Sequence, residues 1–168
     1  MGDDVATLVE SSTYCAAVLV DTLVPLGRVL TEALGCGAAA ERLTPAQYRT
    51  LLFLAKHDGL SSELARFLGV TRSSVTTTVD VLVGRGLVER VPSRSDRRCA
   101  PLRSTAAGQA CLSTARARLL ERVALLLDGL DTEQRGSLLN GLVALHRVLD
   151  ATELRTLHAG AVAMERVS

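Results

Sequence analysis

The most constraining feature of this sequence is a pair of short helical segments separated by a glycine near the middle of the chain. Ser61 or Ser62 can cap a helix that Gly69 is suited to end, because hydroxyl side chains cap helices and glycine stops them. Thr71 can cap a second helix, which the glycines at 84 and 86 would end. Two helices joined by a short turn that contains glycine form a helix-turn-helix.

The second of these helices has one apolar face and one polar face. Val75, Val79 and Leu82 are spaced at i, i+4 and i+7, so they should be buried together. Small side chains allow a helix to lie close in the major groove of DNA, and Arg72 beside the unpaired amides of the first turn suits a phosphate. A merely solvated surface remains the alternative for this outward face, which carries Ser73, Ser74, Thr76, Thr77 and Asp80.

A short hairpin with a basic tip is expected directly after this helix. The segments 87–91 and 99–103 have the composition of strands, although Pro101 restricts the second to edge-like pairing. The turn at 92–98 is polar and basic. Its arginines can neutralise phosphates or enter a narrow minor groove, and they are Arg94, Arg97 and Arg98. A helix-turn-helix followed by such a hairpin predicts a winged helix-turn-helix.

The distribution of charge supports a nucleic-acid partner better than the net charge does. The whole chain carries a formal charge of only +1. Residues 1–34 hold five acids against one arginine, a net of −4, whereas residues 72–103 hold seven arginines against three acids, a net of +4. A locally basic stripe in a nearly neutral chain is what a protein needs if only one face meets phosphates.

A helix is predicted before the helix-turn-helix, and another opens the winged unit itself. Apolar residues recur at nearly helical spacing over 5–34, where Pro25 should kink or break the helix. Thr44-Pro45 then supplies an N-cap and a first-turn proline for the helix that leads into the helix-turn-helix.

Two further helices are predicted after the hairpin. The first should run from Thr105 to about residue 128, and Asp131 or Thr132 should cap the second; residues 151–168 either extend that helix or form a separate segment. The terminal helices carry more leucine at helical spacing than a lone pair of helices could hide. We therefore expect an isologous homodimer built from these helices.

The residue types needed for metal binding or catalysis do not occur in a suitable arrangement. The three histidines lie on separate predicted elements without an HExxH pattern, and no CxxC pair is present. We expect no metal, no cofactor and no enzymatic activity. The cysteines are Cys15, Cys36, Cys99 and Cys111.

The amino-terminal residues are acidic and lack the basic region of a signal peptide. No uninterrupted apolar run reaches about 18 residues, so we expect no membrane-spanning helix. A cytoplasmic protein is the resulting expectation.

Residues 44–105 resemble the multiple antibiotic resistance regulator (MarR) family of bacterial transcription factors. Three motifs carry the resemblance together: LTPAQY at the opening helix, VTRSSVTTTVDVLVGRGLVER, and the wing pair Asp96 and Arg98 leading into Leu102 and Thr105. Ser104 stands where the family usually has leucine. Family members often carry arginine near Thr77 and near Val81, which are uncharged here, so the resemblance shifts the expected affinity toward the wing.

The resemblance implies a mainly α protein with a three-helix core, a two-stranded wing and terminal dimerisation helices. The expected division is an amino-terminal dimerisation helix with its connector (1–43), a winged helix-turn-helix DNA-binding domain (44–104) and carboxyl-terminal dimerisation helices (105–168). The implied function is repression of transcription by a homodimer on a pseudo-palindromic duplex, with Arg98 as the minor-groove arginine and Asp96 orienting it. A surface ion pair is the alternative for Asp96 and Arg98.

Regulation remains open between two mechanisms. The family's effectors are often small aromatic or lipophilic molecules held between the dimer region and the DNA-binding lobe, and this chain offers few aromatic side chains to stack on one. A thiol-based redox sensor on the same scaffold is the alternative, with Cys15 and Cys99 as its candidates, although inert cysteines are commoner. A winged-helix adaptor that binds proteins instead of DNA is the rival from another class.

Overall fold

The structure is a computed structural model that describes the backbone of residues 12–56, 58–91 and 100–165 and side chains as far as residue 150. It divides into two compact units, residues 1–123 and residues 124–168. The elements of the first unit are, in chain order, α2 (Ser12–Gly35), the 3-10 turn η1 (Ala39–Glu41), α3 (Pro45–Leu54), α4 (Ser61–Leu68), α5 (Arg72–Gly84), β1 (Val88–Arg90), β2 (Leu102–Ser104) and most of α6 (Ala106–Leu127).

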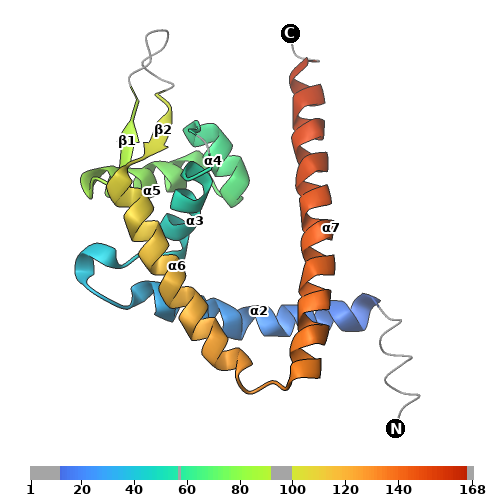
Figure 1. The fold of residues 1–168 in the computed structure, drawn as a ribbon. Helices are drawn as coiled ribbons and strands as arrows, with labels where there is room; N and C mark the ends of the chain where they lie inside the picture. Colours follow the sequence, from blue (N-terminus) through green and yellow to red (C-terminus); the bar gives the residue numbers. More distant parts are fainter. Residues whose placement is uncertain (1–11, 57, 92–99, 166–168) are drawn as a thin grey trace. The chain divides into compact units, whose positions relative to one another are not determined.

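Helices α3, α4 and α5 pack together beside the β1–β2 hairpin, which gives a winged helix-turn-helix (Figure 1). The core is mainly aliphatic, and its largest fully buried apolar side chains come from α2, α3, α4, α5 and both strands: Leu34, Leu51, Leu64, Val75, Val79, Leu82, Val88 and Leu102. The predicted burial of Val75, Val79 and Leu82 is confirmed, since each is at most 1% exposed. The opposite face of α5 is therefore exposed to solvent.

Local side-chain signals set the starts and ends of these helices. The Thr44 hydroxyl accepts from the Gln47 amide at 3.2 Å, and the Gln47 side chain accepts from the Thr44 amide at 3.0 Å, which completes a capping box at the start of α3. Thr71 caps α5 as predicted. Gly69 ends α4 with a φ of +68°, a conformation that glycine adopts without the steric cost of a Cβ.

The predicted cap of α4 was wrong by one or two positions. The helix begins at Ser61 itself, so Leu60 occupies the N-cap position and neither Ser61 nor Ser62 caps the helix. The Leu60 amide donates instead to the Glu63 carboxylate at 2.8 Å. A glutamate in the first turn thus supplies a capping hydrogen bond at a helix start where a hydroxyl was expected to supply one.

Both strands are shorter than predicted, and the second lies further along the chain. They pair antiparallel with Val88 opposite Ser104, Glu89 opposite Arg103 and Arg90 opposite Leu102. The second strand begins after Pro101 because proline has no amide hydrogen for the ladder; its carbonyl still accepts from the Val91 amide at 2.8 Å.

Helix α2 continues through Pro25, so the proline does not end it. This helix is long and apolar enough to cross a membrane by length and composition alone, with a mean hydropathy of 1.4 over its most apolar window. The search for uninterrupted apolar runs in the sequence did not find this helix, because isolated charged residues divide its apolar residues into shorter runs. The core helix of a soluble protein and a signal sequence meet the same criterion, so one such helix is weak evidence for a membrane.

The second unit contains the end of α6 and the long helix α7 (Thr132–Glu165). The Asp131 carboxylate accepts from the Gln134 amide at 2.8 Å, and the Gln134 side chain accepts from the Asp131 amide at 2.9 Å. Asp131, one of the two positions predicted for the cap of this helix, is therefore the cap. Residues 151–165 extend the same helix.

Candidate nucleic-acid interface

The five predicted DNA contacts on α5 lie together on its exposed surface. Arg72, Ser73, Ser74, Thr76 and Thr77 are all exposed, because the core holds the opposite face of the helix. They occupy the first half of the helix, next to its amino-terminal end. Unpaired backbone amides and the positive end of the helix dipole at that end favour a bound anion.

The hydroxyls at the start of α5 form a connected group. The Thr71 hydroxyl oxygen accepts from the Ser74 amide at 3.3 Å and lies 2.9 Å from the hydroxyl oxygens of both Ser73 and Ser74. Both serines are exposed, so their remaining hydrogen-bonding capacity is open to a ligand.

The threonine hydroxyls further along α5 bond to their own helix. Thr76 donates to the Arg72 carbonyl at 3.0 Å, Thr77 to the Ser73 carbonyl at 3.2 Å, and Thr78 to the Ser74 carbonyl at 3.0 Å. A hydroxyl has one hydrogen, and here the helix backbone uses it. Toward a ligand these side chains can present only acceptor lone pairs and methyl groups.

Ion pairs at the base of the wing were not predicted from the sequence. Arg90 on β1 donates to Asp80 on α5, with Nη2 and Oδ1 2.6 Å apart. Arg103 on β2 binds both carboxylate oxygens of Asp58, at 2.6 to 3.1 Å, and lies 3.9 Å from Glu89. The hydrogen bonds that Arg103 donates to Asp58 lower the pKa of the Asp58 carboxyl and raise the pKa of the Arg103 guanidinium.

Two arginines of the basic stripe are therefore already bound by acids of the same chain. Arg90 and Arg103 are held at the base of the wing, where they orient the hairpin against α5 and against the turn before α4. The remaining predicted wing residues, Arg94, Asp96, Arg97, Arg98 and Cys99, lie outside the described residues.

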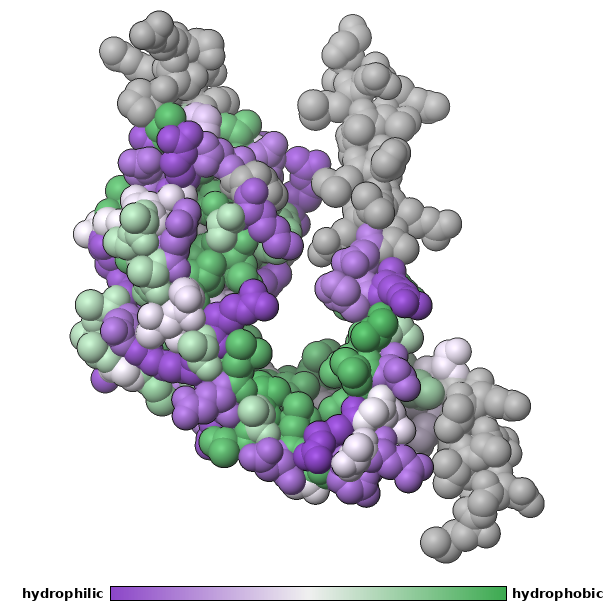
Figure 2. Space-filling view, viewed as in Figure 1, coloured by the Kyte–Doolittle hydropathy of each residue, from purple (hydrophilic) through white to green (hydrophobic). Residues whose placement is uncertain are grey.

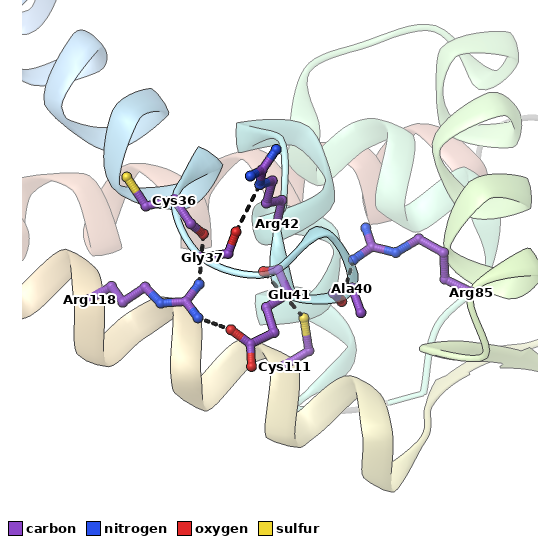
Figure 3. A network of polar contacts seen from close by, with 8 residues as sticks. All are labelled: Cys36, Gly37, Ala40, Glu41, Arg42, Arg85, Cys111 and Arg118. Carbon is purple, nitrogen blue, oxygen red and sulfur yellow. Dashed lines mark hydrogen bonds and ion pairs between the residues drawn. The ribbon is translucent and has the colours of Figure 1, made fainter.

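A second polar network joins the connector between α2 and α3 to α5 and α6 (Figure 3). Arg118 of α6 forms an ion pair with Glu41 and donates to the Cys36 carbonyl at 2.9 Å. Arg85, just past the end of α5, donates to the Ala40 carbonyl at 2.9 Å and to the Gln47 side chain at 3.3 Å. The network ties the end of the proposed recognition helix to the segment that follows α2.

Sequence reasoning missed this network because its partners are far apart along the chain. Arg118 and Cys36 are separated by 82 residues, and Arg85 and Ala40 by 45. Arg85 was counted only as part of the basic stripe. The one local signal was the run of small residues at 35–40, which lets arginine side chains reach backbone carbonyls.

The described cysteines differ in their surroundings. Cys15 on α2 and Cys36 in the connector are exposed, whereas Cys111 on α6 is buried. Burial raises the pKa of the Cys111 thiol, which disfavours the reactive thiolate. Within the described residues, no group of three or more histidine, cysteine or acidic side chains is arranged to hold a metal ion.

Helix-turn-helix, wing and outward hydroxylated helix together define a winged-helix protein of the kind found in transcriptional regulators. The chain belongs to the MarR family, whose sequence profile matches residues 43–98. This is a family of transcription regulators rather than of enzymes.

Individual relatives agree with this family assignment. A putative transcriptional regulatory protein for the hcr operon of Thauera aromatica is 33% identical over 108 residues, which span 64% of this chain and 65% of that protein. The transcriptional repressor CouR, solved bound to a 23-mer DNA duplex, is 31% identical with a TM-score of 0.62, covering 83% of this chain and 94% of that one. Apo MarR from E. coli is 23% identical with a TM-score of 0.68, covering 77% and 94%, and supports the fold alone.

Proposed function

We propose that this chain is a transcriptional repressor that binds double-stranded DNA as a homodimer, with α5 in the major groove and the wing in the minor groove. The observation that carries the proposal is the outward face of α5, whose predicted contacts are all exposed beside a hairpin that follows directly. CouR, which is similar over most of both chains, is itself a repressor solved on DNA.

The residues proposed to contact DNA fall into two groups. On α5, Arg72 is placed for a phosphate, while Ser73, Ser74, Thr76 and Thr77 face the groove. On the wing, Arg94, Arg97 and Arg98 supply positive charge, with Asp96 orienting Arg98. Phosphate contacts give affinity, whereas contacts to base edges give sequence preference.

A homodimer is proposed because the flanking helices expose far more apolar surface than a monomer normally keeps. Leu120, Leu125 and Leu126 on α6 are 60%, 58% and 49% exposed. Figure 2 shows apolar surface over α2 and α6. Among the residues whose side chains the structure describes, α2 and α7 also expose large apolar residues: Tyr14, Val18, Leu19, Val20, Leu23, Val24, Leu26, Leu138, Leu139, Leu142, Val143, Val148 and Leu149.

Burying these residues against their equivalents in a second copy gives an isologous interface from segments 1–43 and 105–168, and leaves 44–104 to contact DNA. Two recognition helices would then meet half-sites about one helical turn apart. An effector would act by favouring a dimer whose recognition helices are wrongly spaced for DNA. Access to chromosomal DNA would require a cytoplasmic location.

The first experiment selects duplexes from a random library with the whole chain and measures their affinity by fluorescence anisotropy at two salt concentrations. Enrichment of an inverted repeat, with affinity that falls steeply as salt rises, is the expected result. Absence of binding at low salt by a folded protein would reject the proposal and leave the adaptor function.

The dimer is tested separately by light scattering at micromolar concentration. A dimeric mass is expected, and Leu139→Asp with Leu142→Asp should shift it toward the monomer by placing carboxylates in the proposed interface. A monomer for the unmodified chain would contradict the dimer but not DNA binding.

Thiol-based regulation has less support. Of its two candidates, Cys15 lies exposed on α2 within the proposed dimer region, and Cys99 lies outside the described residues. Cys111 is a poor further candidate, because burial raises the pKa of its thiol and disfavours the thiolate. Unchanged DNA affinity after mild peroxide treatment would exclude this mechanism.

A further inference from the structure

Beyond its first residue, Arg72, which is placed for a phosphate, the proposed recognition helix lacks the side chains that read guanine. Residues 73–84, SSVTTTVDVLVG, contain no arginine, lysine, asparagine, glutamine or histidine. In the major groove guanine offers only the acceptors N7 and O6, so the protein must supply a donor to recognise it. Within this stretch only hydroxyls and backbone amides could donate.

The threonine hydroxyls cannot serve as those donors in the conformation observed. Thr76 and Thr77 each direct their single hydroxyl hydrogen at a carbonyl four residues earlier. Asp80, the one charged side chain in the stretch, accepts from Arg90. Toward a base pair, the middle of α5 therefore presents acceptors and methyl groups.

The methyl groups lie on the outward side of the helix. Thr77 is two residues from both Val75 and Val79, which are buried, and at about 100° per residue it points away from the core. Val81 follows Thr77 at i+4 on a neighbouring part of the same surface, and its side chain is 45% exposed. The exposed part of this side chain is therefore open to contact by a ligand.

From these contacts we infer that α5 recognises A·T base pairs by the thymine methyl group, through the methyls of Thr77 and Val81. Thymine alone carries a methyl group in the major groove. Its partner adenine has an N6 amino group, which can donate a hydrogen bond to a threonine oxygen. The same surface leaves the acceptors of guanine unpaired. This inference rests on the proposed function, since it specifies what the major-groove helix selects.

The test uses the duplex enriched from the random library and replaces thymine by uracil one position at a time, which removes only the methyl. At one or two positions in each half-site, uracil should weaken binding about fourfold, the effect of losing one buried methyl-sized group. The loss should not change with salt, because an apolar contact releases no counterion. A duplex with C5-methylated cytosine at such a position should bind more tightly than the same duplex with cytosine.

Variants assign the effect to the two side chains. Val81→Ala should reduce the penalty of uracil at one position, and Thr77→Ser, which removes the methyl but keeps the hydroxyl, should reduce the penalty at the other. Thr31→Ser is the matched control, because Thr31 on α2 also donates to a carbonyl four residues earlier, at 2.8 Å, but lies outside α5. It should leave the uracil penalties unchanged.

The outcomes separate the inference from the function beneath it. Affinities within twofold for every uracil duplex, or a half-site whose essential bases are guanines, would overturn the inference while DNA binding stands. Failure to enrich or bind any duplex at low salt would instead overturn the proposed function.

Discussion

The Arg90 guanidinium on β1 donates a hydrogen bond to the Asp80 carboxylate on α5, with Nη2 and Oδ1 2.6 Å apart. The pair joins the wing to the proposed recognition helix. Both side chains are largely exposed, at 42% and 60%. Solvent screening therefore limits what the pair adds to stability, to about 0–1 kcal/mol, and its main effect is on the charge presented to DNA.

Asp80→Asn should strengthen DNA binding. The substitution removes a negative charge from the proposed interface and releases Arg90 for a phosphate, so affinity at low salt should rise several-fold and the slope of log K against log salt should steepen by about 0.9. Anisotropy titrations across salt concentrations measure both quantities. Asp21→Asn removes the same charge from α2, and an equal gain in affinity there would contradict the assignment to α5.

Asp58 should contribute to the dependence of stability on pH. Because Arg103 lowers its pKa in the folded chain, the unfolded chain binds the proton more readily. The stabilisation is present above about pH 4, the ordinary range for aspartate, and is lost as pH falls through the lowered folded value. Asp58→Asn should therefore lower Tm near neutral pH and flatten the acid limb of the Tm profile. Parallel acid limbs for the variant and the unmodified chain would contradict this.

Gly108 should be intolerant of a side chain. An added Cβ would overlap the Leu87 backbone carbonyl and lie 2.8 Å from the Ser104 hydroxyl oxygen. The Thr105 hydroxyl anchors the same turn, since it donates to the Gly86 carbonyl at 2.7 Å. Gly108→Ala should cost about 1–3 kcal/mol in the free energy of unfolding, through forced backbone movement.

The matched control is Gly136→Ala in α7, where nothing lies within 4 Å of the added Cβ. That substitution should stabilise the chain by about 0.4–1 kcal/mol, because alanine loses less backbone entropy in a helix. Urea denaturation of both variants measures the difference. Equal effects of the two substitutions would contradict the close approach of α6 to Leu87.

Arg118→Met should loosen the connector between α2 and α3. The substitution removes the ion pair with Glu41 and the hydrogen bond to the Cys36 carbonyl, while keeping much of the aliphatic stem. Since Arg118 is 24% exposed and Glu41 43%, we expect a loss of about 1 kcal/mol in the free energy of unfolding. Arg116→Met, at an exposed position of the same helix, should change stability by less than about 0.5 kcal/mol.

Much of the winged unit could be predicted because its signals are local. The caps at Thr44, Thr71 and Asp131 use side chains that bond to amides three residues away, so the sequence contains both partners of each bond. The buried face of α5 follows equally from helical spacing. The cap of α4 was misjudged because a glutamate inside the helix and serines at its start are competing local signals.

The sequence by itself determined the fold class, the order of elements and the exposed hydroxylated face of α5, since helical periodicity and capping act over a few residues. Only the tertiary structure decided which arginines are bound by acids and which carbonyls Arg85 and Arg118 contact. Those partners come from distant parts of the chain, and charge composition does not specify pairing. The use of threonine hydroxyls within α5 also required coordinates, because a rotamer decides whether the hydroxyl hydrogen turns toward the helix or toward a ligand.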